Sequence, residues 1–195
     1  MRRATFFSIA AIFLAWPGLA CADDDDDSGP KGTYFIVGSQ ACLYGNAGFD
    51  SINQPNDDNI YSQSGNSQSV ATYNGDGTGT VSGTFVSIVV PPTPGFRPSA
   101  SNGTFQFSFT HSSVSNNSFT SALVPGSYTG TISSGPRAGQ TFTVDRVDRT
   151  HLITNNGKTI TAADVIAAVE NITYSGAPFG PFQRICWHES VGNRR

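Results

Sequence analysis

The sequence predicts an all-β fold: an antiparallel up-and-down β-barrel of about eight to ten strands, or alternatively a two-sheet β-sandwich. The chain is rich in Gly, Ser, Thr, Phe and Val, which favour strands and turns over helices. Residues 104–111 alternate strictly between apolar and polar side chains, as a half-buried strand does. Short segments rich in Gly and Asn separate such stretches, as hairpin turns do. Antiparallel strands joined mainly by hairpins close as a barrel or pack as two sheets.

The first 22 residues have the pattern of a secretory signal peptide. Arg2 and Arg3 precede an apolar run over residues 6–16, and the small residues Ala20 and Ala22 frame a cleavage site. The run is too short for the roughly 20 residues of a membrane-spanning helix, and no later segment approaches that length. We therefore expect an exported protein, periplasmic or extracellular. Lipidation at Cys21 is the alternative, because residues 18–21 approach a lipobox.

Beyond the signal peptide, the chain divides into a short leader and one domain. Residues 23–31 include five consecutive aspartates and no large apolar side chain, which predicts a disordered acidic leader. Residues 32–195 then form a single β domain with scattered charges of both signs. Because no basic stripe is present, we expect no nucleic-acid partner. We also expect no bound metal and no cofactor.

The mature chain retains two cysteines, which predict one disulfide. Cys42 lies near the start of the domain and Cys186 near its end. An exported chain with two cysteines usually joins them, although two buried free thiols are the alternative. In an up-and-down barrel the first and last strands pair, which would bring the two residues together. The expected bridge therefore favours the barrel over the sandwich.

The strands follow in order, each bounded by turn-forming residues. Residues 32–37 predict the first strand, and residues 40–68 a long polar loop around Cys42. The turn at 74–77 joins two strands in the clearest hairpin of the chain. Two further hairpins turn at 133–139 and at 155–157. The remaining predicted strands span 70–73, 78–90, 104–111, 127–132, 141–147, 151–154, 158–161, 169–174 and 183–189.

Two local features predict departures from regular strands. Thr161 and Asp164 have the spacing of a capping box, which predicts one short helix over residues 162–169. Along 78–90 the apolar side switches: Val81 and Phe85 share one face, whereas Val86 and the apolar residues after it take the other. A bulge near Phe85, or burial of both faces at that end, would account for the switch.

The interior of the barrel is the candidate ligand site. Phe105, Phe107, Phe109 and His111 fall on one face of the same strand, so the three rings and the imidazole point into one core. Barrels of about eight strands are either filled by their own side chains or hold one small ligand. We expect a non-enzymatic protein that binds a small apolar or amphipathic molecule there.

Two other functions remain open at this stage. One is a barrel lyase, cyclase or hydrolase that uses His111 with Asp145 or Glu170, although no recognised hydrolase or nucleotide-binding signature is present. The other is a surface-interaction or carbohydrate-binding module, for which exposed Tyr44, Tyr61 or Trp187 on one flat face would be the sign.

One further pattern concerns the last strand. His188 shares a strand face with Arg184 and Cys186, whereas Ile185 and Trp187 take the other face. The three histidines of the chain show no short metal-ligand spacing.

Two sets of residues resemble motifs of other proteins. Gly32-Thr33-Tyr34 at the first strand and Arg184 in the last strand resemble the lipocalin-like (calycin) barrels, in which Gly-x-Trp opens the barrel and an arginine of the final strand packs across the tryptophan. Tyr34 stands in the place of that tryptophan. The resemblance implies a ligand-binding barrel with Arg184 packed against Tyr34. The run 73–79 and the segment 184–186 also resemble small exported bacterial proteins of uncharacterised function.

Overall fold

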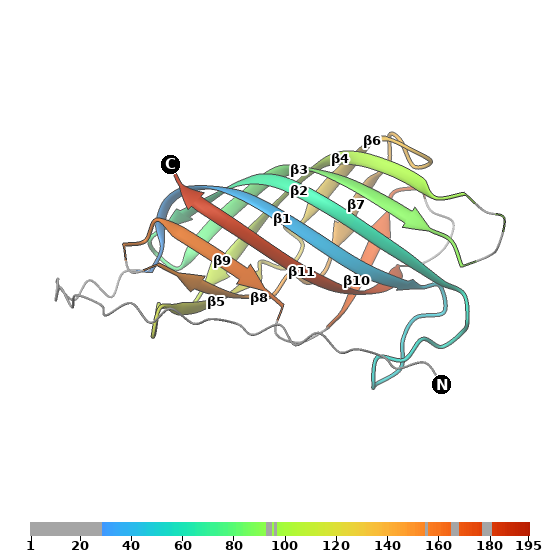
Figure 1. The fold of residues 1–195 in the computed structure, drawn as a ribbon, viewed down its shortest axis with the longest axis horizontal. Helices are drawn as coiled ribbons and strands as arrows, with labels where there is room; N and C mark the ends of the chain where they lie inside the picture. The colour runs from blue at the N-terminus through green and yellow to red at the C-terminus, as the bar shows by residue number, and fades with distance from the viewer. Residues whose placement is uncertain (1–28, 93–94, 96, 155, 165–167, 177–180) are drawn as a thin grey trace, which may run out of the picture.

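A computed structural model of the protein describes residues 29–92, 95, 97–154, 156–164, 168–176 and 181–195. These residues form eleven antiparallel β-strands and no helix, which confirms the all-β prediction (Figure 1). The strands are β1 (Lys31–Gly45), β2 (Ile60–Asn74), β3 (Thr78–Val90), β4 (Ser99–His111), β5 (Ser118–Leu123), β6 (Thr129–Ser134), β7 (Thr141–Val144), β8 (Arg149–Ile153), β9 (Thr159–Ala163), β10 (Ala168–Tyr174) and β11 (Phe182–Arg194). The predicted signal peptide and most of the predicted leader lie outside the described residues.

The first and last strands pair, so the sheet closes on itself. β1 lies between β2 and β11 in Figure 1, and its register with β11 runs from Tyr34 opposite Arg194 to Gly45 opposite Gln183. Following the hydrogen-bonded neighbours gives a ring of eight strands, β1-β2-β3-β4-β6-β7-β10-β11. This closure is the pairing that the barrel prediction required. Because every strand in the ring has two partners, the ring has no free edge.

One side of the ring consists of two shorter arcs placed end to end. β4 pairs with β6 over residues 102–106 and with β5 over residues 109–111. β11 pairs with β10 over residues 182–186 and with β9 over residues 189–193. The first arc is therefore β6-β7-β10 and the second is β5-β8-β9. In this respect the strand order is more elaborate than an up-and-down meander.

Alternation along the strands sends aromatic side chains inward. At the end closed by β5, β8 and β9, buried side chains form a dense cluster that we call the packed end: Tyr34, Ala71, Tyr73, Phe109, Phe119 and Ile160. The Tyr73 ring lies edge-on to the rings of Tyr34, Phe109 and Phe119. Edge-to-face packing adds to the stabilisation that burial of these large rings provides. The packed end therefore fills the ring at that side.

Two inward-facing glycines leave space for aromatic rings to pack directly against the backbone of a neighbouring strand. The Phe109 ring covers Gly79, and the Phe142 ring covers Gly130, each so closely that an added Cβ would overlap the ring. The aromatic side chain thus occupies the space that a side chain on the neighbouring strand would need. A glycine in a strand often marks such a close approach.

The structure corrects two predictions about strand length and irregularity. The predicted loop at 40–68 is shorter, because β1 continues to Gly45 and β2 begins at Ile60. The polar residues at the end of β1 and the start of β2 pair as strands within the closed ring. Their polarity alone does not distinguish such strands from a loop. The predicted bulge near Phe85 is absent from the register between β2 and β3. Val86 faces outward and is 56% exposed, so burial of both faces does not explain the switch either.

The predicted helix at 162–169 is wrong wherever the structure describes it. Residues 162–163 belong to β9 and residues 168–169 to β10, while 165–167 lie outside the described residues. Pairing of β9 with β8 and β11 supplies hydrogen bonds on both edges of the strand. Tertiary pairing therefore overrides the local capping pattern. Asp164, the expected capping residue, instead binds interior side chains.

Candidate functional site

A cavity of about 870 Å³ lies inside the ring, beside the packed end. Its volume falls in the range of pockets that hold small organic ligands. Part of its lining consists of small and polar side chains from β1, β2, β3 and β4: Gln40, Gln63, Ser67, Ser69, Ser87 and Ser101. Another part is aromatic and includes residues of β3 and β4 as well as later residues: Phe85, Phe105, Phe107, Tyr128, Phe142, Tyr174 and Phe182. The ring interior is thus open over part of its length, and its lining combines polar and aromatic side chains.

Three aromatic rings form a stacked group within the cavity. The rings of Phe107 and Tyr128 are nearly parallel, with their centroids 5.3 Å apart. The Phe105 ring is almost parallel to both of them. Burial raises the pKa of Tyr128 to about 12, so its hydroxyl stays neutral at any physiological pH. These rings offer a flat apolar face with one hydroxyl beside it.

The four predicted ligand-binding residues all come from β4, and the structure divides them between two environments. Phe105, Phe107 and Phe109 line the cavity, with Phe109 also part of the packed end. His111 does not line the cavity: its ring packs beside Tyr73 and its Nδ1 lies 2.9 Å from the carbonyl oxygen of Ser112. The shared strand face was thus correctly predicted. What the β4 pattern could not show is that the packed end separates His111 from the open space.

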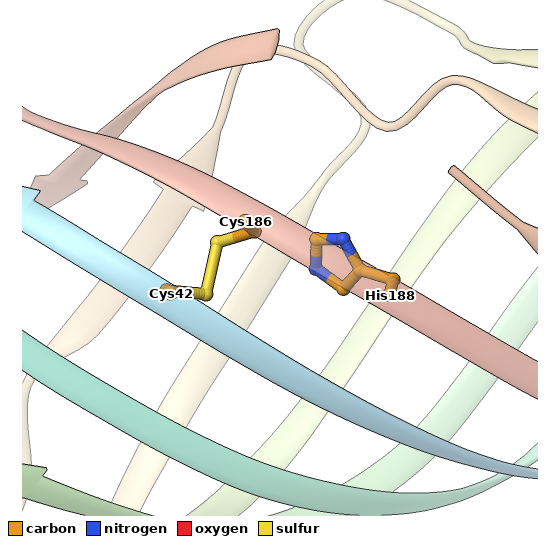
Figure 2. Close-up of side chains that lie close together, drawn as sticks. All are labelled: Cys42, Cys186 and His188. Atoms are coloured by element: carbon orange, nitrogen blue, oxygen red, sulfur yellow. A yellow bond between two sulfur atoms is a disulfide. The ribbon is translucent and has the colours of Figure 1, made fainter. Parts of the chain in front are cut away.

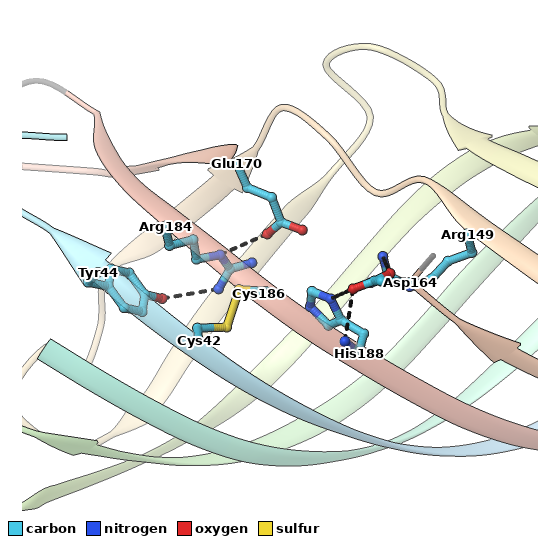
Figure 3. Close-up of a disulfide and its surroundings, with 8 residues drawn as sticks. All are labelled: Cys42, Tyr44, Arg149, Asp164, Glu170, Arg184, Cys186 and His188. Atoms are coloured by element: carbon cyan, nitrogen blue, oxygen red, sulfur yellow. Dashed lines mark hydrogen bonds and ion pairs between the residues drawn. A yellow bond between two sulfur atoms is a disulfide. The ribbon is translucent and has the colours of Figure 1, made fainter. Parts of the chain in front are cut away.

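The cavity lining contains a buried ion pair that sequence reasoning did not identify. Arg184 Nε donates to Glu170 Oε2 at 2.8 Å, and Arg184 Nη1 donates to the Tyr44 hydroxyl at 3.0 Å (Figure 3). Both charged side chains are less than a tenth exposed. β10 and β11 place Glu170 and Arg184 directly opposite each other in register. The sequence shows that Arg184, Cys186 and His188 share one strand face, but it does not show that the strand containing Glu170 lies beside them.

A second charged cluster lies where the two arcs meet. Asp164 accepts a 2.6 Å hydrogen bond from Arg149 Nη1, and its other oxygen binds both the backbone N–H and the Nδ1 of His188 (Figure 3). Burial raises the pKa of Asp164, but the hydrogen bond from His188 and the charge of Arg149 outweigh it, so the pKa falls below its ordinary value. Burial also lowers the pKa of His188. Asp164 is therefore an anion that orients a neutral imidazole.

His151 lines the cavity with one of its two ring nitrogens paired. Its Nε2 lies 2.7 Å from the Ser121 hydroxyl, and its ring stacks on Phe119 with the centroids 4.4 Å apart. Its Nδ1 is buried without a hydrogen-bond partner among the described residues, as is Oε1 of Gln63, another residue of the cavity lining. Because both atoms are fully buried, neither is presented to the open space of the cavity.

Stability should fall in mild acid because of His151. Burial, with a contribution from Arg149, lowers the pKa of His151 from 6.5 to about 3. Between these two values the unfolded chain takes up a proton that the native chain does not, so the free energy of unfolding decreases as the pH drops. The slope should approach 1.4 kcal/mol per pH unit for one proton. In His151→Gln, urea unfolding between pH 6.5 and 4 should show a shallower slope; an unchanged slope would contradict this assignment.

The catalytic alternative requires residues that the structure does not bring together. His111 packs against the packed end, Glu170 is bound to Arg184, and the exposed Asp145 accepts hydrogen bonds from Asn171. The aromatic residues of the surface-module alternative are also separated. Tyr44 and Tyr61 line the cavity, whereas Trp187 points outward and is about half exposed.

The packing of arginine on the first-strand aromatic residue differs from the lipocalin-like pattern. Tyr34 is opposite Arg194 in register and donates to the carbonyl oxygen of Gly157 at 2.6 Å. Arg184 lies opposite Tyr44 instead, near the other end of β1. The implied contact between Arg184 and Tyr34 is therefore absent, and the equivalent contact is made with Tyr44.

No protein-family model matches the chain, and a search of the curated proteins found no match. In the described part of the chain, no helix has the length and apolar character needed to cross a membrane. Support for a function of this protein therefore comes from the geometry of the cavity.

Proposed function

We propose that this protein is an exported, non-enzymatic binding protein that holds one small amphipathic molecule inside its strand ring. The observation that carries the proposal is the cavity of about 870 Å³, which is lined both by aromatic rings and by serine and glutamine side chains. A filled structural ring would need no such space. Export is supported by the disulfide, which persists in oxidising compartments.

The mixed lining of the cavity defines the chemistry of the ligand. An apolar or aromatic body would lie against the stacked rings of Phe105, Phe107 and Tyr128. Hydroxyl, amide or carbonyl groups of the same molecule would pair with the serine and glutamine side chains of the lining. Burial of the apolar body contributes about 25 cal/mol per Å² of area removed from water, and the polar side chains fix its orientation.

Arg137 favours a negatively charged group on the ligand. Its guanidinium lies over the Tyr174 ring, 4.3 Å from the centroid, and also over Phe182. Among the described residues, no acidic side chain forms an ion pair with Arg137, although it lines the cavity. Arginine held flat on aromatic rings presents its N–H groups in a fixed plane that suits a carboxylate. We therefore expect fatty acids to bind more tightly than their methyl esters.

The test fills the cavity from a polar position of its lining. Ser67 faces inward on β2, and Ser67→Trp places an indole in the open space. Ser64 is exposed on the same strand and does not line the cavity, so Ser64→Trp is the matched control. We expect wild type and Ser64→Trp to bind a fluorescent fatty acid equally, with Ser67→Trp at least tenfold weaker. Fluorescence titration measures the affinities, and circular dichroism checks that both variants fold.

Two results would overturn the proposed function. One is the absence of saturable binding of the fatty acid, of its methyl ester and of any molecule retained by the purified protein in native mass spectrometry. The other is equal loss of affinity in Ser67→Trp and Ser64→Trp, which would show that the interior position has no special role in binding. Equal affinity for acid and ester would remove the role of Arg137 but leave the interior site.

A further inference from the structure

The two half-cystines and His188 form a compact group inside the ring. The Cys42 and Cys186 sulfurs are joined as a disulfide, and both residues are buried (Figure 2). The two sulfurs and a nitrogen of His188 all lie within 4.8 Å of one another. The three residues come from adjacent strands: Cys42 from β1, and Cys186 and His188 from the same face of β11.

Asp164 fixes which nitrogen of His188 can act as a ligand. The carboxylate oxygen of Asp164 accepts from Nδ1 at 2.7 Å, so Nδ1 carries the proton and Nε2 keeps its lone pair. Figure 2 shows the nitrogen farther from Cβ on the side of the two sulfurs. In metal sites, a carboxylate commonly orients a ligating histidine in this way. Arg149 donates a hydrogen bond to the other oxygen of the same carboxylate, which holds Asp164 in the position that orients His188.

We propose that, once the disulfide is reduced, Cys42, Cys186 and His188 bind a thiophilic cation, with Zn²⁺ as the reference ion. In a tetrahedral zinc site, bonds of about 2.3 Å to sulfur and about 2.0 Å to nitrogen put the donor atoms roughly 3.5 to 3.8 Å apart. The present group meets that spacing after small shifts of side chains. Two thiolates, one imidazole and an open fourth position is a known donor set for zinc.

The chemistry makes the site dependent on redox state. A dithiol reductant transfers two electrons and two protons to the protein disulfide: the S–S bond breaks, two thiols form, and the reductant becomes a disulfide. The cation then displaces one proton from each thiol as two metal–sulfur bonds form. In the disulfide form the sulfurs carry no charge and lack thiolate donors. The oxidised protein should therefore not bind the metal here.

The strand ring is expected to survive the reduction. β1 and β11 remain hydrogen-bonded along their whole shared register, on both sides of the cysteine pair. The bridge is therefore an addition to a closed ring and not the only connection that closes it. Reduction would free the two sulfurs while the backbone still holds them opposite each other.

The experiment titrates Co²⁺, a spectroscopic substitute for Zn²⁺, into the protein with and without prior reduction by a phosphine that is then removed. We expect one Co²⁺ per reduced chain, with a thiolate-to-cobalt charge-transfer band and strong tetrahedral d–d bands that Zn²⁺ abolishes. The oxidised protein should show neither band. His188→Asn should weaken binding at least tenfold, whereas His111→Asn, which alters a histidine beside the packed end and outside the cavity lining, should leave binding unchanged.

The outcomes are decisive in each case. Absence of thiolate bands in the reduced protein, bands in the oxidised protein, or equal affinity in wild type and His188→Asn would overturn the proposal. If the reduced protein loses its circular dichroism signal, recovery of that signal on adding Zn²⁺ in wild type but not in His188→Asn supports it, and no recovery overturns it. None of these readouts depends on ligand binding in the cavity.

Discussion

Replacing Glu170 by leucine is expected to lower the free energy of unfolding by about 3 kcal/mol or more. Arg184 would keep its charge in a position that is less than a tenth exposed, and among the described residues its remaining hydrogen-bond partner would be the Tyr44 hydroxyl. An uncompensated buried charge costs much more than the net stabilisation that the intact pair provides. Chemical unfolding monitored by tyrosine fluorescence measures the loss.

Two comparisons separate this effect from a general loss of packing. The double variant Glu170→Leu with Arg184→Met should recover most of the stability, because replacing both partners by apolar side chains leaves no charge to compensate. Asp148→Asn breaks the exposed ion pair between Arg146 and Asp148, whose side chains are about half exposed, and should change stability by less than about 1 kcal/mol. A double variant as unstable as Glu170→Leu would contradict the buried-charge explanation.

Loss of the disulfide should have an effect of similar size. The bridge joins residues 144 positions apart, and the chain-entropy model assigns such a closed loop up to about 5 kcal/mol. We expect the variant with both Cys42→Ser and Cys186→Ser to lose between about 2 and 5 kcal/mol in guanidinium unfolding. Its β-sheet circular dichroism should persist, because the backbone register of β1 and β11 is independent of the bridge.

A second measurement distinguishes loop entropy from local packing of the sulfurs. Phosphine reduction of the wild type should produce nearly the same loss as the double serine variant, since both release the same loop. A loss confined to the serine variant would show that the hydroxyls, and not the missing cross-link, are responsible. An unchanged unfolding midpoint in both would contradict a stabilising role for the bridge.

Local sequence patterns predicted the features that depend on neighbours along the chain. Turn chemistry predicts the hairpin around residues 74–77. The two-residue period of a strand predicts the common face of Phe105, Phe107, Phe109 and His111. The helix predicted over 162–169 followed from an equally local signal and was wrong. The pairing partners of β9 decided the conformation there, and no pattern within those residues records them.

The same distinction between local patterns and strand pairing applies to the candidate site. Composition predicts the all-β chain, alternation predicts the inward aromatic strand face, and the two cysteines of the mature chain predict the disulfide. These features depend on neighbouring residues or on a single bond. Which part of the aromatic face is packed and which lines a cavity depends on tertiary structure. The contacts of Glu170 with Arg184 and of Asp164 with His188 depend on it too, since register between strands distant in sequence sets them. Closure of the ring explains the difference, because it brings strands together whose neighbours the chain order does not specify.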